Sequence, residues 1–394
     1  MRIVYFNYMA DLYGSSIGST IKAQELLGHL RERGHEVTSF WRYGKTSPKT
    51  ERSRADKRSP LRHPFLRRIL YTPKEIVKNI FDLIAEYRFI VKHKPDIIIS
   101  RVDAYRFSSS LLARWCGIPL LLEADGANSY EWLQYNNRDG IIWKRCLLLI
   151  EKLNFRIASQ VFVQSTVTKI YYDQLYGYGH KIGVITNAAT PRTSPERAAL
   201  RAEFSMQPAS VVCGFLGSLH YWHGTNVLQE LISRVVEKYD QLVFLIVGGG
   251  GPNAEDFKAF CYAKPWSKRV IIHDYQDHAD VHHYINLFDI ALAPYTDQNL
   301  FYYSPVKIFE YMALAKPVLT VPVGQIEEII QHGYNGYFFK PGCMTDLEEK
   351  LAELIHNSDL RQMLGRHALT TIRQHHTWTH KAKELEQMCL KAKN

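Results

Sequence analysis

Short apolar runs recur along the chain, and each is followed by a stretch of helical character. Near-continuous Val, Ile and Leu runs are typical of strands buried on both faces, and their alternation with helices indicates a parallel sheet. Five such runs open the chain: Ile3–Phe6, Ile97–Ser100, Pro119–Glu123, Val161–Gln164 and Gly183–Thr186. They predict an α/β domain over residues 1–187.

The alternation of strand-like runs and helical stretches stops after residue 187 and resumes at residue 211. Residues 188–210 contain three prolines and little apolar periodicity, so they are predicted to be a linker carrying one short helix. A second domain is predicted over residues 211–377, and a Lys/Glu-rich helix over 378–394 that could pack back on the first domain. The second series of runs is Val211–Leu216, Val243–Val247, Val270–His273, Ile290–Ala293, Val318–Val321 and Tyr337–Phe339.

Positive charge is concentrated in one segment. The 394 residues carry a net charge of +10, and eleven Lys/Arg against two acidic residues place +9 of it between Arg42 and Lys74. This excludes a generally basic nucleic-acid coat and indicates one patch for phosphates, an acidic substrate or anionic lipid, with a solvated surface loop as the alternative. Because Pro64–Tyr71 suits a short amphipathic helix, we expect this segment to dock on an anionic membrane leaflet.

The chain shows no signal-peptide pattern, and no apolar run reaches the ~18 residues that a membrane span needs. Its six cysteines include no C-x-x-C pair, which favours reduced thiols. We therefore expect a cytoplasmic protein that is peripheral at the cytoplasmic face of the inner membrane.

Two glycine-containing loops follow predicted strands. In DLYGSSIGST, Gly14, Ser15, Ser16 and Gly18 precede a helix and could expose backbone amides to a ligand, although an ordinary strand-to-helix loop explains them equally well. The spacing does not fit a dinucleotide fingerprint.

The second loop, GFLGSLHYWHG, follows the first strand of the second domain. Gly217, Ser218 and His223 are expected to contact a phosphate there, because parallel sheets bind ligands at the carboxyl ends of their strands. A plain tight turn is the alternative.

The segment YYSPVKIFEYMALAKP predicts a helix start with an anion site. Ser304 is expected to be the N-cap and Pro305 the first helical residue. Lys307 in the first turn opposes the helix dipole unless an anion is bound, and Glu310 on the same face could accept from two ribose hydroxyls. The alternative is a Lys307–Glu310 pair on a solvated face.

Two carboxylates end a buried strand of the first domain. Glu123 and Asp125 could orient an acceptor hydroxyl or stabilise a developing oxocarbenium charge. Capping of the next helix by Asp125 or Asn128 is the alternative.

Metal and cofactor sites are not expected. The chain has no D-x-D, and three histidines lack the acidic or cysteine partners of a zinc site, so they are predicted on the surface of a helix: His278, His282 and His283.

The residues of the second domain resemble retaining glycosyltransferase family 4, of GT-B fold, in the subgroup with an SPxKxFEYMA donor motif. The resemblance covers most of the chain and is carried by Ser304-Pro305-x-Lys307-x-x-Glu310-Tyr311-Met312-Ala313, Lys316-Pro317-Val318, Gly324-x-x-x-Glu328, Asn335-Gly336, Gly217-Ser218 and Ile185–Ala188. It implies two facing Rossmann-like domains, with a nucleotide sugar on the second and an acceptor on the first.

The same resemblance implies roles for single residues. Gly217 and Ser218 would meet the diphosphate, Lys307 would neutralise it and Glu310 would hold the ribose. Many members carry a glutamate eight positions before Glu310, where this chain has Tyr302. No enzymic nucleophile is implied, because the departing diphosphate is thought to act as the base.

The expected function is metal-independent, retaining transfer of a sugar, from a UDP-sugar donor, to a hydroxyl of a glycan or lipid-linked glycan in surface polysaccharide biosynthesis. No nucleic acid is expected as a partner. The alternatives are a sugar-nucleotide epimerase of similar build and a non-catalytic protein that binds anionic membranes or nucleic acid through Arg42–Lys74.

Overall fold

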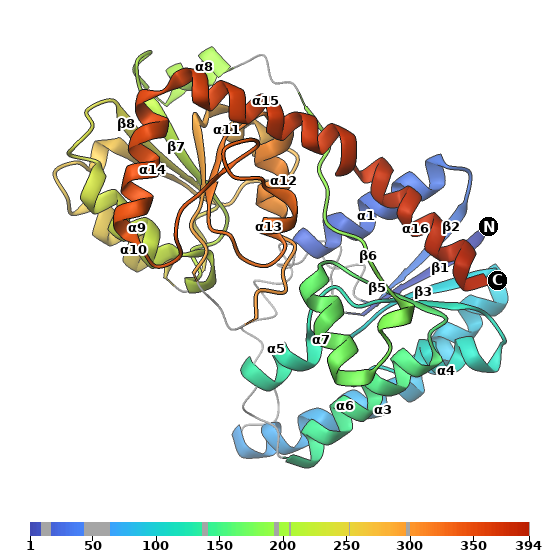
Figure 1. Cartoon of the computed structure of the whole chain (residues 1–394). Coiled ribbons are helices and arrows are strands. Elements are labelled where there is room, and N and C mark those ends of the chain that lie inside the picture. Colours follow the sequence, from blue (N-terminus) through green and yellow to red (C-terminus); the bar gives the residue numbers. More distant parts are fainter. Residues whose placement is uncertain are drawn as a thin grey trace. The chain divides into compact units, whose positions relative to one another are not determined.

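The computed structural model describes residues 1–8, 17–42, 64–135, 141–192, 197–204, 206–251, 253–296 and 300–393. These residues form two compact units (Figure 1). The first combines Met1–Thr186 with Trp378–Asn394, and the second is Asn187–Thr377. The segment predicted as a linker thus lies within the second unit, and its predicted short helix is α8 (Arg197–Glu203).

The first unit is built around a sheet of six parallel strands in the order β2-β1-β3-β4-β5-β6. The strands are β1 (Arg2–Asn7), β2 (Glu36–Trp41), β3 (Ile97–Arg101), β4 (Leu120–Glu123), β5 (Gln160–Val163) and β6 (Ile182–Val184). The helical elements are α1 (Ile17–Glu32), α3 (Pro64–His93), α4 (Ser108–Trp115), α5 (Asn128–Tyr135), α6 (Ile141–Ile157), α7 (Thr166–Tyr176), η1 (Gly179–Lys181) and α16 (Trp378–Lys393).

The second unit repeats this architecture with the strand order β12-β11-β10-β7-β8-β9, again all parallel. Its strands are β7 (Val211–Leu216), β8 (Leu242–Val247), β9 (Val270–His273), β10 (Ile290–Ala293), β11 (Val318–Thr320) and β12 (Tyr337–Phe338). Besides α8, its helical elements are η2 (Tyr221–His223), α9 (Thr225–Val235), α10 (Ala254–Tyr262), η3 (Ser267–Arg269), α11 (Val281–Leu287), α12 (Val306–Ala313), α13 (Ile326–Ile329), α14 (Met344–His356) and α15 (Ser358–His375).

The predicted fold class is confirmed, because each unit has a parallel sheet with helices around it. Strand β2 is the one described strand absent from the sequence prediction. It is an edge strand that pairs only with β1, and Thr38 and Ser39 are half-buried, so no continuous apolar run marks it.

The last helix, α16, belongs to the first unit, as predicted. It packs against α1, β4 and β5 and buries Trp378 and Leu385. Glu386 fixes it further, because its carboxylate pairs with Arg33, whose Nε lies 2.9 Å away, and with His35 Nε2 at 2.7 Å. The chain therefore passes twice between the units, after Thr186 and after Thr377.

Candidate active site

The carboxyl end of β7 and the first turn of α12 meet in the second unit. The backbone N–H of Leu216 donates to the Tyr311 hydroxyl at 2.7 Å, which holds α12 against this strand end. Gly217 follows β7 directly, and Lys307 is the second residue of α12. The structure therefore brings together the two segments that the sequence predicted to meet a diphosphate.

Lys307 is a buried cation. Its side chain is 8% exposed, and its Nζ lacks a hydrogen-bond partner among the described residues. Two aromatic faces stabilise its charge, with Nζ 4.3 Å from the centroid of Phe215 and 5.4 Å from that of Tyr295. Burial lowers the pKa of this ammonium from its usual value to about 7, so it is poised to gain from a nearby anion.

Glycine at position 217 leaves room for the Lys307 side chain. The backbone there has φ of +132°, and a Cβ on residue 217 would lie 2.9 Å from Lys307 Nζ. Any other side chain would strain the backbone and push the ammonium away.

We expect Gly217→Ala to weaken UDP binding about tenfold, because it displaces the charge-assisted contact of Lys307. Calorimetric titration with UDP measures this effect. Gly34→Ala is the matched control, since Gly34 also has a positive φ, of +87°, but no atom within 4 Å of the added Cβ. Equal UDP affinity of the wild-type protein and Gly217→Ala would contradict the expectation.

His223 and Ser218 form a second part of the loop. The carbonyl oxygen of Ser218 lies 2.8 Å from His223 Nδ1, so Nδ1 carries the proton. Burial, assisted by the positive charge of Lys307, lowers the pKa of His223 to about 3. His223 is therefore neutral at pH 7: its Nε2 can accept a hydrogen bond from a ligand, but the ring can neither donate one to a phosphate nor supply positive charge.

Ser304 does not cap α12, so the predicted N-cap was wrong. The helix begins at Val306 with Pro305 in the N-cap position and no side-chain cap bond. The Ser304 hydroxyl instead accepts from the backbone N–H of Asn187 at 2.9 Å, and the Asn187 side-chain amide donates to the Ser304 carbonyl at 2.5 Å. A tertiary contact has thus taken the place of the local cap.

Glu310 has a partner that the sequence did not suggest. His278 Nε2 lies 2.8 Å from a Glu310 carboxylate oxygen. Lys307 is buried and Glu310 pairs with His278, so the alternative of a Lys307–Glu310 pair on a solvated face is wrong. The bond orients the Glu310 carboxylate, whose side chain remains 14% exposed.

The three histidines do not share one helix. His278 precedes α11, whereas His282 and His283 lie within it. Among the described residues no group of three His, Cys, Asp or Glu side chains could hold a metal ion. Metal independence of the reaction stays a prediction.

In the first unit, Glu123 and Asp125 lie in a buried charge network rather than on an open surface. Asp125 pairs with Lys22 and, at 3.4 Å, with Arg101, while Glu123 accepts from the Tyr5 hydroxyl at 2.6 Å. Although burial opposes it, the two cations hold the pKa of Asp125 below its usual value. Burial and the charge of Asp125 raise the pKa of Glu123 to about 7. Asp125 thus neutralises two buried cations, and its predicted catalytic role stays a prediction.

The remaining predicted residues fall partly outside the described chain. Gly14, Ser15 and Ser16 are not among the described residues, and Gly18 lies in the first turn of α1. Sequence reasoning missed Phe215 and Tyr295, which read as ordinary strand and loop residues. Their only sequence signal is position: Phe215 lies near the carboxyl end of β7, within the predicted ligand loop, and Tyr295 follows the carboxyl end of β10.

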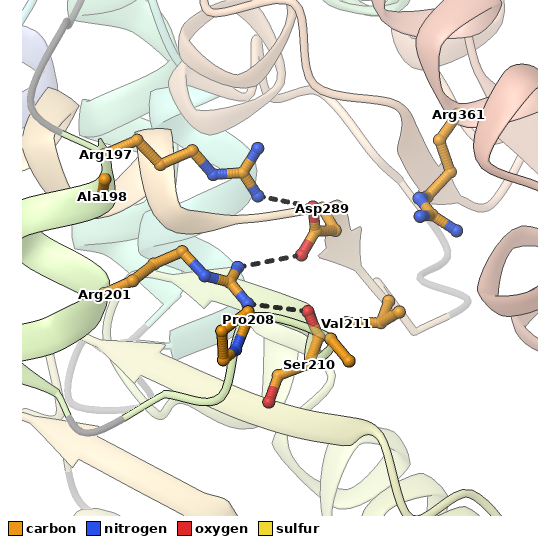
Figure 2. A pocket seen from close by; sticks show the side chains of 9 residues that line it. Arg197, Ala198, Arg201, Pro208, Ser210, Val211, Asp289 and Arg361 are labelled. Carbon is orange, nitrogen blue, oxygen red and sulfur yellow. Dashed lines mark hydrogen bonds and ion pairs between the residues drawn. The ribbon is translucent and has the colours of Figure 1, made fainter.

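A pocket of about 550 Å³ lies at the opposite edge of the same sheet (Figure 2). It adjoins the starts of β7 and β10, where Asp289 accepts from Arg197 at 2.5 Å and from Arg201 at 3.4 Å. Arg361 donates to the carbonyls of Leu354 and Ile355 at the end of α14. Arg197 and Arg201 thus join α8 to the starts of β7 and β10, and Arg361 joins α15 to α14. The pocket is separate from the Lys307 site, which lies at the carboxyl end of β7.

Comparisons with known proteins agree with the two-unit fold. Residues 18–191 match the model of Glycosyltransferase Family 4, and residues 197–370 match that of Glycosyl transferases group 1. A glycosyltransferase structure from Rickettsia africae has 18% identity and a TM-score of 0.72, covering 99% of this chain and 98% of that one. The Anabaena HepE structure, a complex with UDP and glucose, has 17% identity and a TM-score of 0.69 over 98% of both chains.

Curated relatives match over shorter segments. Alpha-D-kanosaminyltransferase of Streptomyces kanamyceticus is 20% identical over 176 residues, which are 45% of this chain and 44% of that protein. The curated matches cover between 16% and 52% of the relatives' own length. Each half of the chain thus matches a glycosyltransferase model, and the fold along the whole chain is that of the GT-B glycosyltransferases.

Proposed function

We propose that this protein transfers a sugar from a UDP-sugar to a hydroxyl of a glycan or lipid-linked glycan, with retention, in surface polysaccharide biosynthesis. The observation that carries the proposal is Lys307, a buried ammonium without a described hydrogen-bond partner, beside the close-approach glycine Gly217. A diphosphate supplies the negative charge that this arrangement lacks, and HepE, which shares the fold, is known in complex with UDP and glucose.

The residues assigned here act on the leaving group of the reaction, which is the diphosphate. The bond between the sugar and the diphosphate breaks, the acceptor oxygen bonds to the same sugar carbon, and the acceptor proton passes to the departing phosphate. Lys307 and the first-turn amides of α12 stabilise the charge that develops on the diphosphate. No side chain is assigned as nucleophile.

The experiment is incubation with a panel of nucleotide sugars, scoring hydrolysis of each and then transfer to glycan acceptors. We expect slow hydrolysis of one or more UDP-sugars and faster turnover with an acceptor. An epimerase would instead return an isomeric nucleotide sugar without release of UDP. Absence of both UDP binding and hydrolysis across the panel would contradict the proposal.

Glu310 provides a separate test of the ribose assignment. We expect Glu310→Gln to bind UDP and 2′-deoxy-UDP with similar affinity, because an amide in place of the carboxylate loses a charge-assisted hydrogen bond to the ribose. Wild-type protein should favour UDP by about tenfold. Calorimetry with both nucleotides measures the affinity ratio, and Glu230→Gln, at an exposed position of α9, is the control. An unchanged preference in Glu310→Gln would refute the assignment.

A further inference from the structure

Three neighbouring helices of the first unit expose large apolar side chains. Helix α4 packs against both α3 and α6, so the three lie side by side. Phe81, Trp115 and Ile142 are 69%, 68% and 69% exposed. We call this surface the α3–α4–α6 face, and its exposed apolar residues are Val77, Ile80, Phe81, Ile84, Tyr87, Val91, Trp115, Ile142, Leu149 and Leu153.

The spacing on α3 shows that the exposure is organised. Residues 77, 80, 81, 84, 87 and 91 recur every three or four positions and so form one stripe along the helix. A stripe of this kind is normally buried against another element. Monomeric proteins rarely expose contiguous apolar surface of such extent unless it serves binding.

The charges on the same face have a single sign. Seven exposed cations accompany the apolar residues: Lys74, Arg88, Lys92, Arg114, Arg145, Lys152 and Arg156. Among the described side chains of these three helices, no acidic residue is exposed. The α3–α4–α6 face therefore presents apolar and positive groups together.

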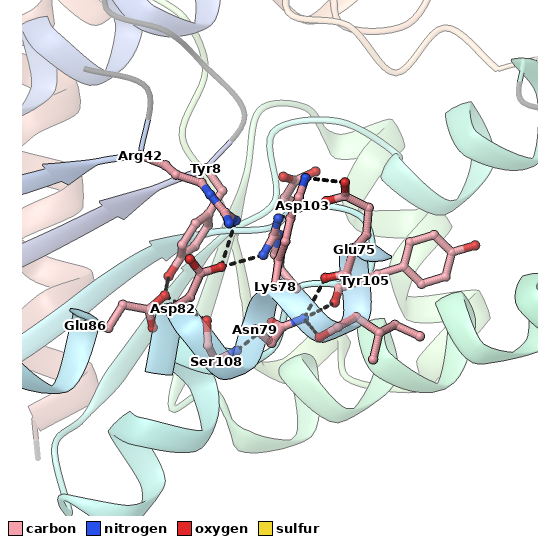
Figure 3. A network of polar contacts seen from close by, with 12 residues as sticks. Tyr8, Arg42, Glu75, Lys78, Asn79, Asp82, Glu86, Asp103, Tyr105 and Ser108 are labelled. Carbon is pink, nitrogen blue, oxygen red and sulfur yellow. Dashed lines mark hydrogen bonds and ion pairs between the residues drawn. The ribbon is translucent and has the colours of Figure 1, made fainter. Parts of the chain in front are cut away.

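The acidic residues of α3 point inward (Figure 3). Asp82 accepts from Arg42 at 2.7 Å and from Arg106 at 2.5 Å. Glu86 accepts from the hydroxyls of Tyr8 and Ser108, both at 2.8 Å. The carboxylates of Asp82 and Glu86 thus have their partners inside the unit.

Two further acidic residues of these helices, Glu75 of α3 and Glu151 of α6, also point inward. Glu75 pairs with Arg106 at 2.9 Å, and Glu151, the acidic residue of α6, is buried and accepts from the Tyr176 hydroxyl at 2.6 Å. Every acidic side chain described on these helices is therefore paired with a neighbouring side chain. The exposed charges of the three helices are positive.

We propose that the α3–α4–α6 face docks the protein on an anionic lipid surface. Charge complementarity selects the anionic headgroups, and the apolar side chains enter the boundary between headgroups and acyl chains. A second copy of this chain fits less well, because a symmetric contact would set seven cations against the same seven. A nucleic acid fits less well because seven of the ten apolar residues are aliphatic and offer no stacking surface.

This proposal concerns described residues and differs from the docking expected through Arg42–Lys74. Residues 43–63 lie outside the described chain, so that expectation stays a prediction. None of the described helices is both long and apolar enough to cross a bilayer. Docking at the surface needs no such helix.

Flotation of the full chain with vesicles tests the proposal. We expect recovery with phosphatidylglycerol/phosphatidylcholine vesicles and little with phosphatidylcholine alone. Phe81→Glu/Ile84→Glu should lower the partition coefficient at least about tenfold. Arg88→Gln/Lys92→Gln should lower it roughly 30-fold, and added salt should weaken the wild-type binding.

The control is Tyr262→Glu, which places a single glutamate on an exposed aromatic position (57%) of α10 in the second unit. It should float like wild type. Circular dichroism and the thermal midpoint report whether each variant folds, and vesicle binding is measured without any sugar donor, so the outcome is independent of the proposed transfer. Equal recovery on neutral vesicles, or unchanged flotation of both α3 variants, would overturn the proposal. Two other results would also overturn the proposal. They are a dimer, or a complex with duplex DNA, that is lost in the same variants while the protein shows no vesicle binding.

Discussion

Replacing Lys307 with methionine is expected to weaken UDP binding at least tenfold while raising the thermal stability of the free protein. The loss follows from removing a charge-assisted contact of ~1.5–3 kcal/mol to the diphosphate. The gain follows from burial, because the wild-type ammonium lies among aromatic rings without a described hydrogen-bond partner, where methionine packs at no desolvation cost. Calorimetry with UDP and thermal unfolding without ligand measure the two effects.

The stability difference should depend on pH in a defined direction. Lys307 has a pKa of about 7 in the folded protein, below the 10.5 of the unfolded chain. Between these values the unfolded state binds more protons, so the stability of wild type rises with pH across that window. The stability of Lys307→Met should therefore exceed that of wild type most at pH 7 and below. The difference in stability should become smaller toward pH 10.

The control is Lys238→Met, at an exposed lysine of the same unit whose side chain is 56% exposed. It should change neither UDP affinity nor the pH profile. If Lys307→Met bound UDP normally, or were less stable than wild type at pH 7, the assignment of Lys307 as an anion site would be wrong.

The same substitution at Lys22 should have the opposite effect on stability. Lys22 is 1% exposed and pairs with the buried carboxylate of Asp125. Lys22→Met leaves that carboxylate with Arg101 alone, and breaking a buried ion pair costs about 3–5 kcal/mol. Chemical denaturation monitored in the first unit should show this loss, with the second unit's transition unchanged.

Two further variants test whether the lost buried ion pair causes the loss of stability in Lys22→Met. Arg2→Met breaks a pair with Asp96 whose side chains are 46% and 27% exposed, so it should cost at most about 1 kcal/mol. Adding Asp125→Asn to Lys22→Met should recover little of the loss, because it removes the partner of the buried Arg101 guanidinium. A loss for Lys22→Met no larger than for Arg2→Met would contradict the expectation.

The alternation of apolar runs was enough to predict eleven of the twelve strands that the structure describes, because strands buried on both faces are marked by their apolar composition. Strand β2 lacked that signal since it is an edge strand with polar, half-buried residues. Gly217 and Lys307 were each expected near a phosphate from their own segments, but it was the resemblance to family 4 that gave both a place at one diphosphate.

Contacts over long sequence distances were beyond such reasoning. Ser304 has the local pattern of an N-cap, yet its hydroxyl accepts from Asn187, 117 positions earlier. The His278–Glu310 bond spans 32 positions and joins two segments whose patterns are independent. Local propensity could not anticipate either partner, since both bonds depend on how the completed sheet brings loops together.

The return of α16 to the first unit sets an order for folding during synthesis. The first unit is the earliest to emerge from the ribosome, but α1, β4 and β5 pack on a helix that is translated only after the whole of the second unit. Trp378, Leu385 and Cys389 are buried there, so the nascent first unit leaves an apolar groove open until α16 arrives. The second unit can thus be complete before the unit that precedes it, and truncation before Trp378 would impair the first unit rather than the second.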